Sequence, residues 1–106
     1  MGRGLTRILK RIRELAAAGA VRFTMKAEVE LAALRLDEGD AHDVLARLSV
    51  SDFVGTVSSE ATGESMHVFK PWVFGVMLYV KVVVRDACVV VSFHEDEGSV
   101  DGEKTA

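Results

Sequence analysis

Two valine-rich segments near the C-terminal end constrain the fold of this chain more than any other feature. Residues 76–84 read Val-Met-Leu-Tyr-Val-Lys-Val-Val-Val, and residues 88–94 read Cys-Val-Val-Val-Ser-Phe-His, with the break Arg-Asp-Ala between them. Two runs of β-branched residues separated by a short charged break are typical of paired antiparallel strands. The sequence therefore predicts a β-hairpin.

Alternation along the hairpin sorts its side chains onto two faces, because successive residues of a strand point to opposite sides of the sheet. Residues 76–84 place an apolar set on one face, and Tyr79 and Lys81 on the other. A two-residue turn at 86–87 pairs Tyr79 with His94 and Lys81 with Ser92, whereas a three-residue loop would separate Tyr79 from His94. We expect one core face and one face that carries chemistry.

Three helices are expected before the sheet. Helical spacing of apolar residues predicts a first helix over residues 6–18, capped by Gly19 at its C-terminal end, and a third helix that opens at Asp37. Thr24 is the expected N-cap of the second helix. The expected buried stripe of this second helix consists of Met25, Val29, Ala32, Ala33 and Leu36.

Further strands are expected near residues 53–58 and 66–70, separated by turn-forming residues 59–64 and ended by Pro71. Because helices precede strands, the predicted fold class is α+β, with N-terminal helices packed on a three- to four-stranded antiparallel sheet. Residues 1–96 are long enough for one domain with its own core. The acidic, glycine-bearing residues 97–106 predict a disordered tail.

Charge is distributed unevenly along the chain, although the formal net charge is only −3. Residues 1–26 hold seven Arg and Lys against Glu14 alone, while residues 27–69 hold two against nine carboxylates. The basic face of the first helix is either an ordinary solvated face or a contact surface for phosphate or a partner protein. The sequence leaves both interpretations open.

Several features indicate a cytoplasmic protein. The longest apolar run, residues 73–84, is too short to span a bilayer and carries Tyr79 and Lys81. Arginines and a lysine interrupt any hydrophobic segment near the N-terminus, so no signal peptide is expected. The single cysteine, Cys88, excludes an internal disulfide and suits a reducing compartment.

The hairpin and the strand beside it contribute six polar side chains to a candidate site: Tyr79, Lys81, Ser92, His94, Lys70 and His67. Such residues suit a reaction at a phosphodiester, with a base for a ribose 2′-hydroxyl, cations for phosphoryl oxygens and an acid for the leaving 5′-oxygen. Histidine can act as base or acid, and tyrosine can donate a proton or stack on a base. The alternative is a sheet face that is polar because it is wet.

A metal site or a cysteine nucleophile is not expected. His42, His67, His94 and Cys88 lack the local spacing of zinc ligands. Alternation puts Cys88 on the face of His94 but at the far end of the strand, which favours a small buried filler over a nucleophile. His42 is expected on the surface.

The order of several short segments resembles the MqsR toxins. They are residues 9–12, 18–22, 34–37, 48–53, 68–71, 78–82 and 90–95. The resemblance extends from about residue 5 to residue 96. It implies a RelE-like fold and a bacterial toxin that acts without a cofactor as an endoribonuclease on mRNA. It also implies neutralisation by a cognate antitoxin protein.

Carried over by position, the resemblance assigns Tyr79 to the active-site tyrosine of the family and His94 to the position of a catalytic lysine. Two sites depart from the pattern, because Val54-Gly55 stands where the family has Tyr-Lys and Met66 stands where a glutamine is expected. The roles of these family residues do not carry over to this chain. The alternatives are a weakened member that binds RNA or an antitoxin, and a small protein–protein interaction module.

Overall fold

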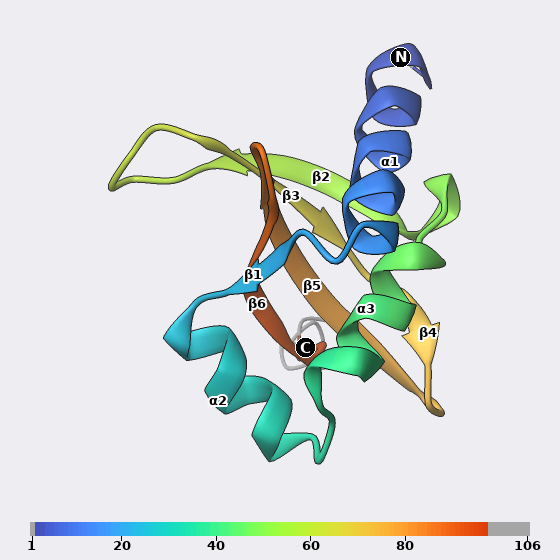
Figure 1. Ribbon diagram of the computed structural model, residues 1–106, viewed down its shortest axis with the longest axis vertical. Helices are drawn as coiled ribbons and strands as arrows, with labels where there is room; N and C mark the ends of the chain where they lie inside the picture. The colour runs from blue at the N-terminus through green and yellow to red at the C-terminus, as the bar shows by residue number, and fades with distance from the viewer. Residues whose placement is uncertain (1, 98–106) are drawn as a thin grey trace, which may run out of the picture.

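The computed structural model describes residues 2–97, which form helices on one side of a twisted sheet (Figure 1). The helices are α1 (Gly2–Ala17), α2 (Met25–Ala33), α3 (Glu38–Ala46) and the short 3₁₀ helix η1 (Val50–Asp52). The strands are β1 (Val21–Phe23), β2 (Phe53–Ser58), β3 (Ser65–Phe69), β4 (Trp72–Val73), β5 (Val76–Val84) and β6 (Cys88–Glu95). The predicted α+β class is confirmed.

The sheet in the described part of the chain has the strand order β1-β6-β5-β3-β2, and β4 also pairs with β5. The expectation of three or four antiparallel strands was wrong, because the sheet has six strands and β1 runs parallel to β6. β1 has only three residues, too few for a periodic pattern to identify a strand. Its place depends on distant partners: the Cys88 N–H donates to the Ala20 carbonyl at 2.9 Å.

The predicted hairpin is confirmed as β5 and β6, and it has the expected pairs Tyr79–His94 and Lys81–Ser92. The turn was predicted wrongly. Residues 85–87 form a three-residue loop, since the residues on either side of them are paired. An odd loop alone would have placed Tyr79 and His94 on opposite faces.

A β-bulge at Val91 restores the predicted pairing. The register shifts by one residue between the pairs Lys81–Ser92 and Val82–Val90, so Val91 is the extra residue on β6. An extra residue reverses the alternation of the side chains beyond it. The odd loop and the bulge therefore cancel one another at the end of the hairpin that carries the candidate site.

The bulge also corrects the expected position of Cys88. On the loop side of the bulge, Cys88 and Val90 belong to the core cluster, together with Val82. Cys88 is therefore on the face opposite to His94, not on the same face. It is fully buried, as expected for a small core residue.

Helix α1 packs against α3 and over β5 and β6 (Figure 1). The largest fully buried side chains between helices and sheet are Ile12, Leu45, Leu48, Phe69, Leu78, Val80, Val82, Val90 and Phe93. Burial of a side chain of this size stabilises the fold by about 1.5–3 kcal/mol. This core fixes which face of the sheet remains for chemistry.

The helix caps follow the sequence signals. Gly19 has a φ of 74°, and the Ala20 N–H returns to the Leu15 carbonyl at 2.8 Å, as in a glycine-capped C-terminus. Asp37 and Asp40 form the reciprocal capping box of α3. Helix α1 begins at Gly2, earlier than predicted, because Thr6 does not interrupt the helix.

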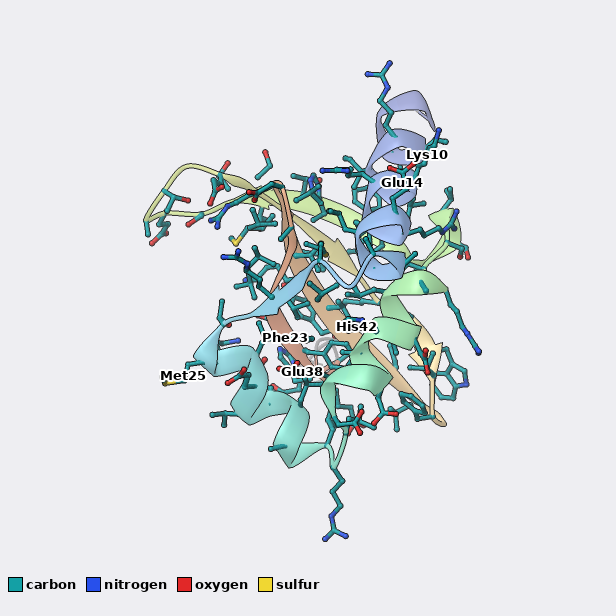
Figure 2. All side chains as sticks on the ribbon, viewed as in Figure 1. Lys10, Glu14, Phe23, Met25, Glu38 and His42 are labelled. Carbon is teal, nitrogen blue, oxygen red and sulfur yellow. The ribbon has the colours of Figure 1, made fainter. Side chains whose placement is uncertain are left out.

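Helix α2 presents a different face to the core than predicted. Ala27 and Leu31 are buried, whereas Met25 is 80% exposed and Val29 is 65% exposed. Figure 2 shows Met25 pointing away from the rest of the molecule. Both stripes have helical spacing, and the docking of α2 on β6 buries the one that contains Ala27 and Leu31.

His42 is half-buried rather than fully on the surface. Its ring stacks on Phe23 of β1, with ring centroids 6.4 Å apart, and Figure 2 shows the two side chains side by side. This contact joins α3 to the edge strand β1. It lies on the helix side of the sheet.

Within residues 2–97, no helix is both long enough and apolar enough to span a membrane. Most of the tail for which disorder was expected, residues 98–106, lies outside the described residues.

Candidate active site

Strand register places nine residues on the face of the sheet that points away from the core, which we call the site face. They form three rows across neighbouring strands: Trp72, Met77 and Asp96; Lys70, Tyr79 and His94; and Val68, Lys81 and Ser92. Residues directly opposite one another on paired strands share a face. Tyr79 and His94 are therefore brought together as the sequence predicted.

Tyr79 and His94 form a stacked pair at the centre of the site face. Their ring centroids are 5.0 Å apart and the ring planes differ by 10°. Nδ1 of His94 lies 2.8 Å from the Glu95 carbonyl oxygen. A carbonyl oxygen only accepts, so Nδ1 carries the hydrogen. In the neutral ring, Nε2 then holds the lone pair that can accept a proton.

Lys70 lies in the middle row, opposite Tyr79, because β3 and β4 pair with β5 in one continuous register. Its ammonium forms an ion pair with Asp96, with 3.2 Å from Nζ to Oδ1. The Asp96 side chain is 4% exposed, and its backbone N–H donates to the Met77 carbonyl at 2.8 Å. This ion pair holds a cation across the site face beside the Tyr79–His94 stack.

Lys81 and Ser92 share the third row but differ in accessibility. Lys81 is half-buried, whereas Ser92 is 2% exposed. The Ser92 hydroxyl accepts a hydrogen bond from Nζ of Lys26 at 2.9 Å. Ser92 therefore anchors a lysine of α2 rather than lying open to a substrate. Sequence reasoning missed Lys26 here, because its spacing to Glu30 showed a pair but not where α2 docks.

Glu30 connects α2 to the strand that carries His94. Its carboxylate accepts the Phe93 backbone N–H at 2.8 Å and pairs with Lys26 at 2.8 Å. Burial alone would raise the pKa of Glu30. The hydrogen bonds from Lys26 and Phe93, with the nearby charges of Lys26 and His94, outweigh burial and lower its pKa. An ionised carboxylate thus covers the open edge of β6 within electrostatic reach of His94.

His67 does not join the other candidate residues, which corrects the sequence-based expectation. It pairs with Val82, a core residue, and so points to the helix side of the sheet. Nδ1 of His67 lies 3.0 Å from the Thr56 hydroxyl, and partial burial lowers the pKa of His67. The alternation of β3, with Val68 on the site face, decides this orientation.

Two of the three positions that depart from the expected family pattern, Gly55 and Met66, lie on the site face. Gly55 pairs with Val68, after a bulge at Val54. Met66 lies two residues before Val68 on β3, so it shares the face of Val68. Gly55 and Met66 therefore lie on the same face of the sheet as Tyr79 and His94.

Within residues 2–97, no group of three or more His, Cys, Asp or Glu side chains gathers in an arrangement that holds a metal ion. Burial raises the pKa of Cys88 to about 12, so this thiol stays protonated. Among the described residues of the site face, Tyr79 and His94 are the candidates for proton transfer, and Lys70 and Lys81 supply positive charge.

Comparison with known families gives a match over residues 6–95, which is most of the chain. The matching family model is described as motility quorum-sensing regulator, toxin of MqsA. A search among curated proteins found no match.

Proposed function

The chain belongs to the MqsR toxin family, and from this premise we propose that it is a cytoplasmic, RelE-like endoribonuclease that cleaves mRNA and is inhibited by its cognate antitoxin. A toxin of this family implies an antitoxin partner. The observation that carries the catalytic part is the Tyr79–His94 stack, flanked on the site face by Lys70 and Lys81.

The reaction uses His94 as general base and Tyr79 as general acid. Nε2 of His94 takes the proton from a ribose 2′-hydroxyl, whose oxygen attacks the adjacent phosphorus. The bond from phosphorus to the 5′-oxygen breaks, and the Tyr79 hydroxyl gives its proton to that oxygen. The products are a 2′,3′-cyclic phosphate and a 5′-hydroxyl, and the proton on His94 returns to Tyr79 through solvent.

Positive charge on the site face stabilises the transition state. Lys81 lies one row from the stack and Lys70 lies in the same row. Ammonium groups held near the phosphoryl oxygens offset the negative charge that develops on them. Asp96 fixes the Lys70 ammonium in place, which lowers the entropy lost when phosphate binds. These side chains supply base, acid and charge, so the proposed steps need no metal.

A second candidate function is a weakened member of the family that binds RNA or the antitoxin without efficient cleavage. Gly55 and Met66 favour it, because both positions lie on the site face and neither offers a proton or a charge. The two functions differ in catalysis and not in the surface used.

Substitution of the stacked pair tests the catalytic proposal. Wild type, His94→Ala and Tyr79→Phe are incubated with mixed-sequence RNA in EDTA. Loss of one acid or base group is expected to lower the cleavage rate by about 10²–10⁴-fold. His67→Ala is the matched control, since it removes a histidine from the helix side, and its rate should stay near wild type.

Equal cleavage by wild type and both site variants would refute the assigned roles. If wild type binds RNA with steep salt dependence but does not cut it, the binding-only function is correct. Loss of wild-type cleavage in EDTA, restored by added metal, would show that the reaction depends on a metal.

A further inference from the structure

Trp72 is an exposed aromatic residue at the end of the site face, and the reaction described above does not use it. It pairs with Met77 in the first row, next to the row of Lys70, Tyr79 and His94. Its side chain is 66% exposed, although tryptophan is usually well covered in folded domains. The fold holds a large flat ring in solvent beside the candidate catalytic pair.

The local backbone fixes where this ring stands. β4 turns into β5 through Phe74 and Gly75, whose φ values are 57° and 79°. Two successive positive φ angles form a tight type I′ hairpin turn, which matches the twist of paired strands. Because β4 is pinned to β5 by this turn, Trp72 has a set position relative to Tyr79.

The surroundings of Trp72 favour a nucleic acid over an apolar protein surface. Lys70 lies two residues before it on the same face, about 7 Å away along the strand. Lys81 lies two rows from it, and Asp96 in its own row is paired with Lys70. An aromatic face in line with two lysines, Lys70 and Lys81, suits a ligand that alternates flat bases with phosphates, which is single-stranded RNA.

We propose that Trp72 is a stacking platform for a base of the bound RNA next to the phosphodiester that is cleaved. The inference rests on the proposed ribonuclease function and names how its substrate is held. A phosphate held between Lys70 and Lys81 leaves the adjoining nucleotide directed along the strand towards Trp72. Stacking is tolerant of base identity, so Trp72 contributes affinity and positioning for any sequence.

Trp72 is the single tryptophan of the chain, so its fluorescence reports this contact alone. The protein is titrated with a 2′-O-methyl RNA oligonucleotide, which lacks the attacking hydroxyl and is not cleaved. A second titration uses an abasic oligonucleotide of the same length. We expect Trp72 emission to be quenched by the first and not by the second, while fluorescence anisotropy of end-labelled oligonucleotides measures binding of both.

Variants give the second measurement. Trp72→Ala is expected to weaken binding of the 2′-O-methyl RNA by about 5- to 150-fold, and Trp72→Phe to recover part of the loss. Phe74→Ala is the matched control, because Phe74 is 59% exposed on the same turn but lines a cavity on the helix side together with Val44 and Arg47. Its affinity for RNA should equal that of wild type.

The outcomes separate this inference from the function on which it rests. If RNA binds or is cleaved without quenching of Trp72 emission, and Trp72→Ala binds RNA as tightly as wild type, the stacking role is overturned. The proposed ribonuclease function then stands. If Trp72→Ala keeps its affinity for RNA but binds the antitoxin more weakly, the stacking role is overturned. Trp72 is then a contact for the antitoxin. Absence of both RNA binding and cleavage in wild type would overturn the function and the inference together.

Discussion

Replacement of Gly55 by lysine is expected to increase the proposed ribonuclease activity, because it adds a cation to the site face at a position where the resemblance to the MqsR toxins predicts a lysine. Gly55 pairs with Val68, in the row that continues to Lys81. A Cβ atom added at Gly55 meets nothing within 4 Å, and the backbone there is outside the left-handed region. The substitution therefore fits without displacing a neighbour.

The size of the gain follows from two opposing free energies. A hydrogen bond to a charged group contributes about 1.5–3 kcal/mol, and ordering a lysine side chain costs about 1.5–2 kcal/mol. At most about 1.5 kcal/mol remains, or roughly a tenfold gain in kcat/KM. Loss of a glycine from a strand also adds about 0.5–1 kcal/mol of stability, so Tm should rise by about 2–8 °C.

The assay compares initial cleavage rates of one defined RNA by wild type, Gly55→Lys, Gly55→Ala and Thr56→Lys. Thr56 is exposed on the same strand and pairs with His67, so its lysine adds the same charge to the helix side. Gly55→Ala separates strand stability from charge. If Gly55→Lys cleaves no faster than wild type, or Thr56→Lys gains as much, the placement of the site is wrong.

Three further predictions concern the supports of the site. Glu30→Ala should lower the free energy of unfolding by about 1–3 kcal/mol, because the part-buried Phe93 N–H loses its acceptor; Glu30→Gln should lose less, and equal losses in thermal denaturation would contradict this role. The lowered pKa of Glu30 stabilises the fold above its ordinary value of 4.5, so the stability advantage over Glu30→Gln should shrink as pH falls through that range; an advantage that does not decrease as pH falls below 4.5 would refute it. Burial raises the pKa of Cys88 to about 12, so Ellman's reagent should label it only after unfolding, and rapid labelling of native protein would exclude its core position.

The hairpin could be predicted because alternation and β-branched runs are local signals. Two local errors cancelled at the site end: the loop at residues 85–87 is one residue longer than expected, and the bulge at Val91 restores the pairing of Tyr79 with His94. No residue type marks this bulge in the sequence. The same bulge moves Cys88 to the core, which alternation without it did not show.

The remaining differences come from long-range contacts. β1 is a strand because β6 supplies its parallel partner, and α2 buries Ala27 and Leu31 because it docks on β6. This docking brings Lys26 and Glu30 to the site strand, although their spacing alone indicates only a surface pair. A pattern within one element cannot specify which neighbour covers it.

The chemical nature of the cleavage products tests the central claim most directly, that Tyr79 and His94 act together on one phosphodiester. RNA cleaved by the wild-type protein is analysed by mass spectrometry of the new ends. Attack by the 2′-hydroxyl predicts a 2′,3′-cyclic phosphate and a 5′-hydroxyl, and no cut where the attacking nucleotide is 2′-deoxy. A 3′-hydroxyl with a 5′-phosphate, or cleavage at a 2′-deoxy position, would contradict the account.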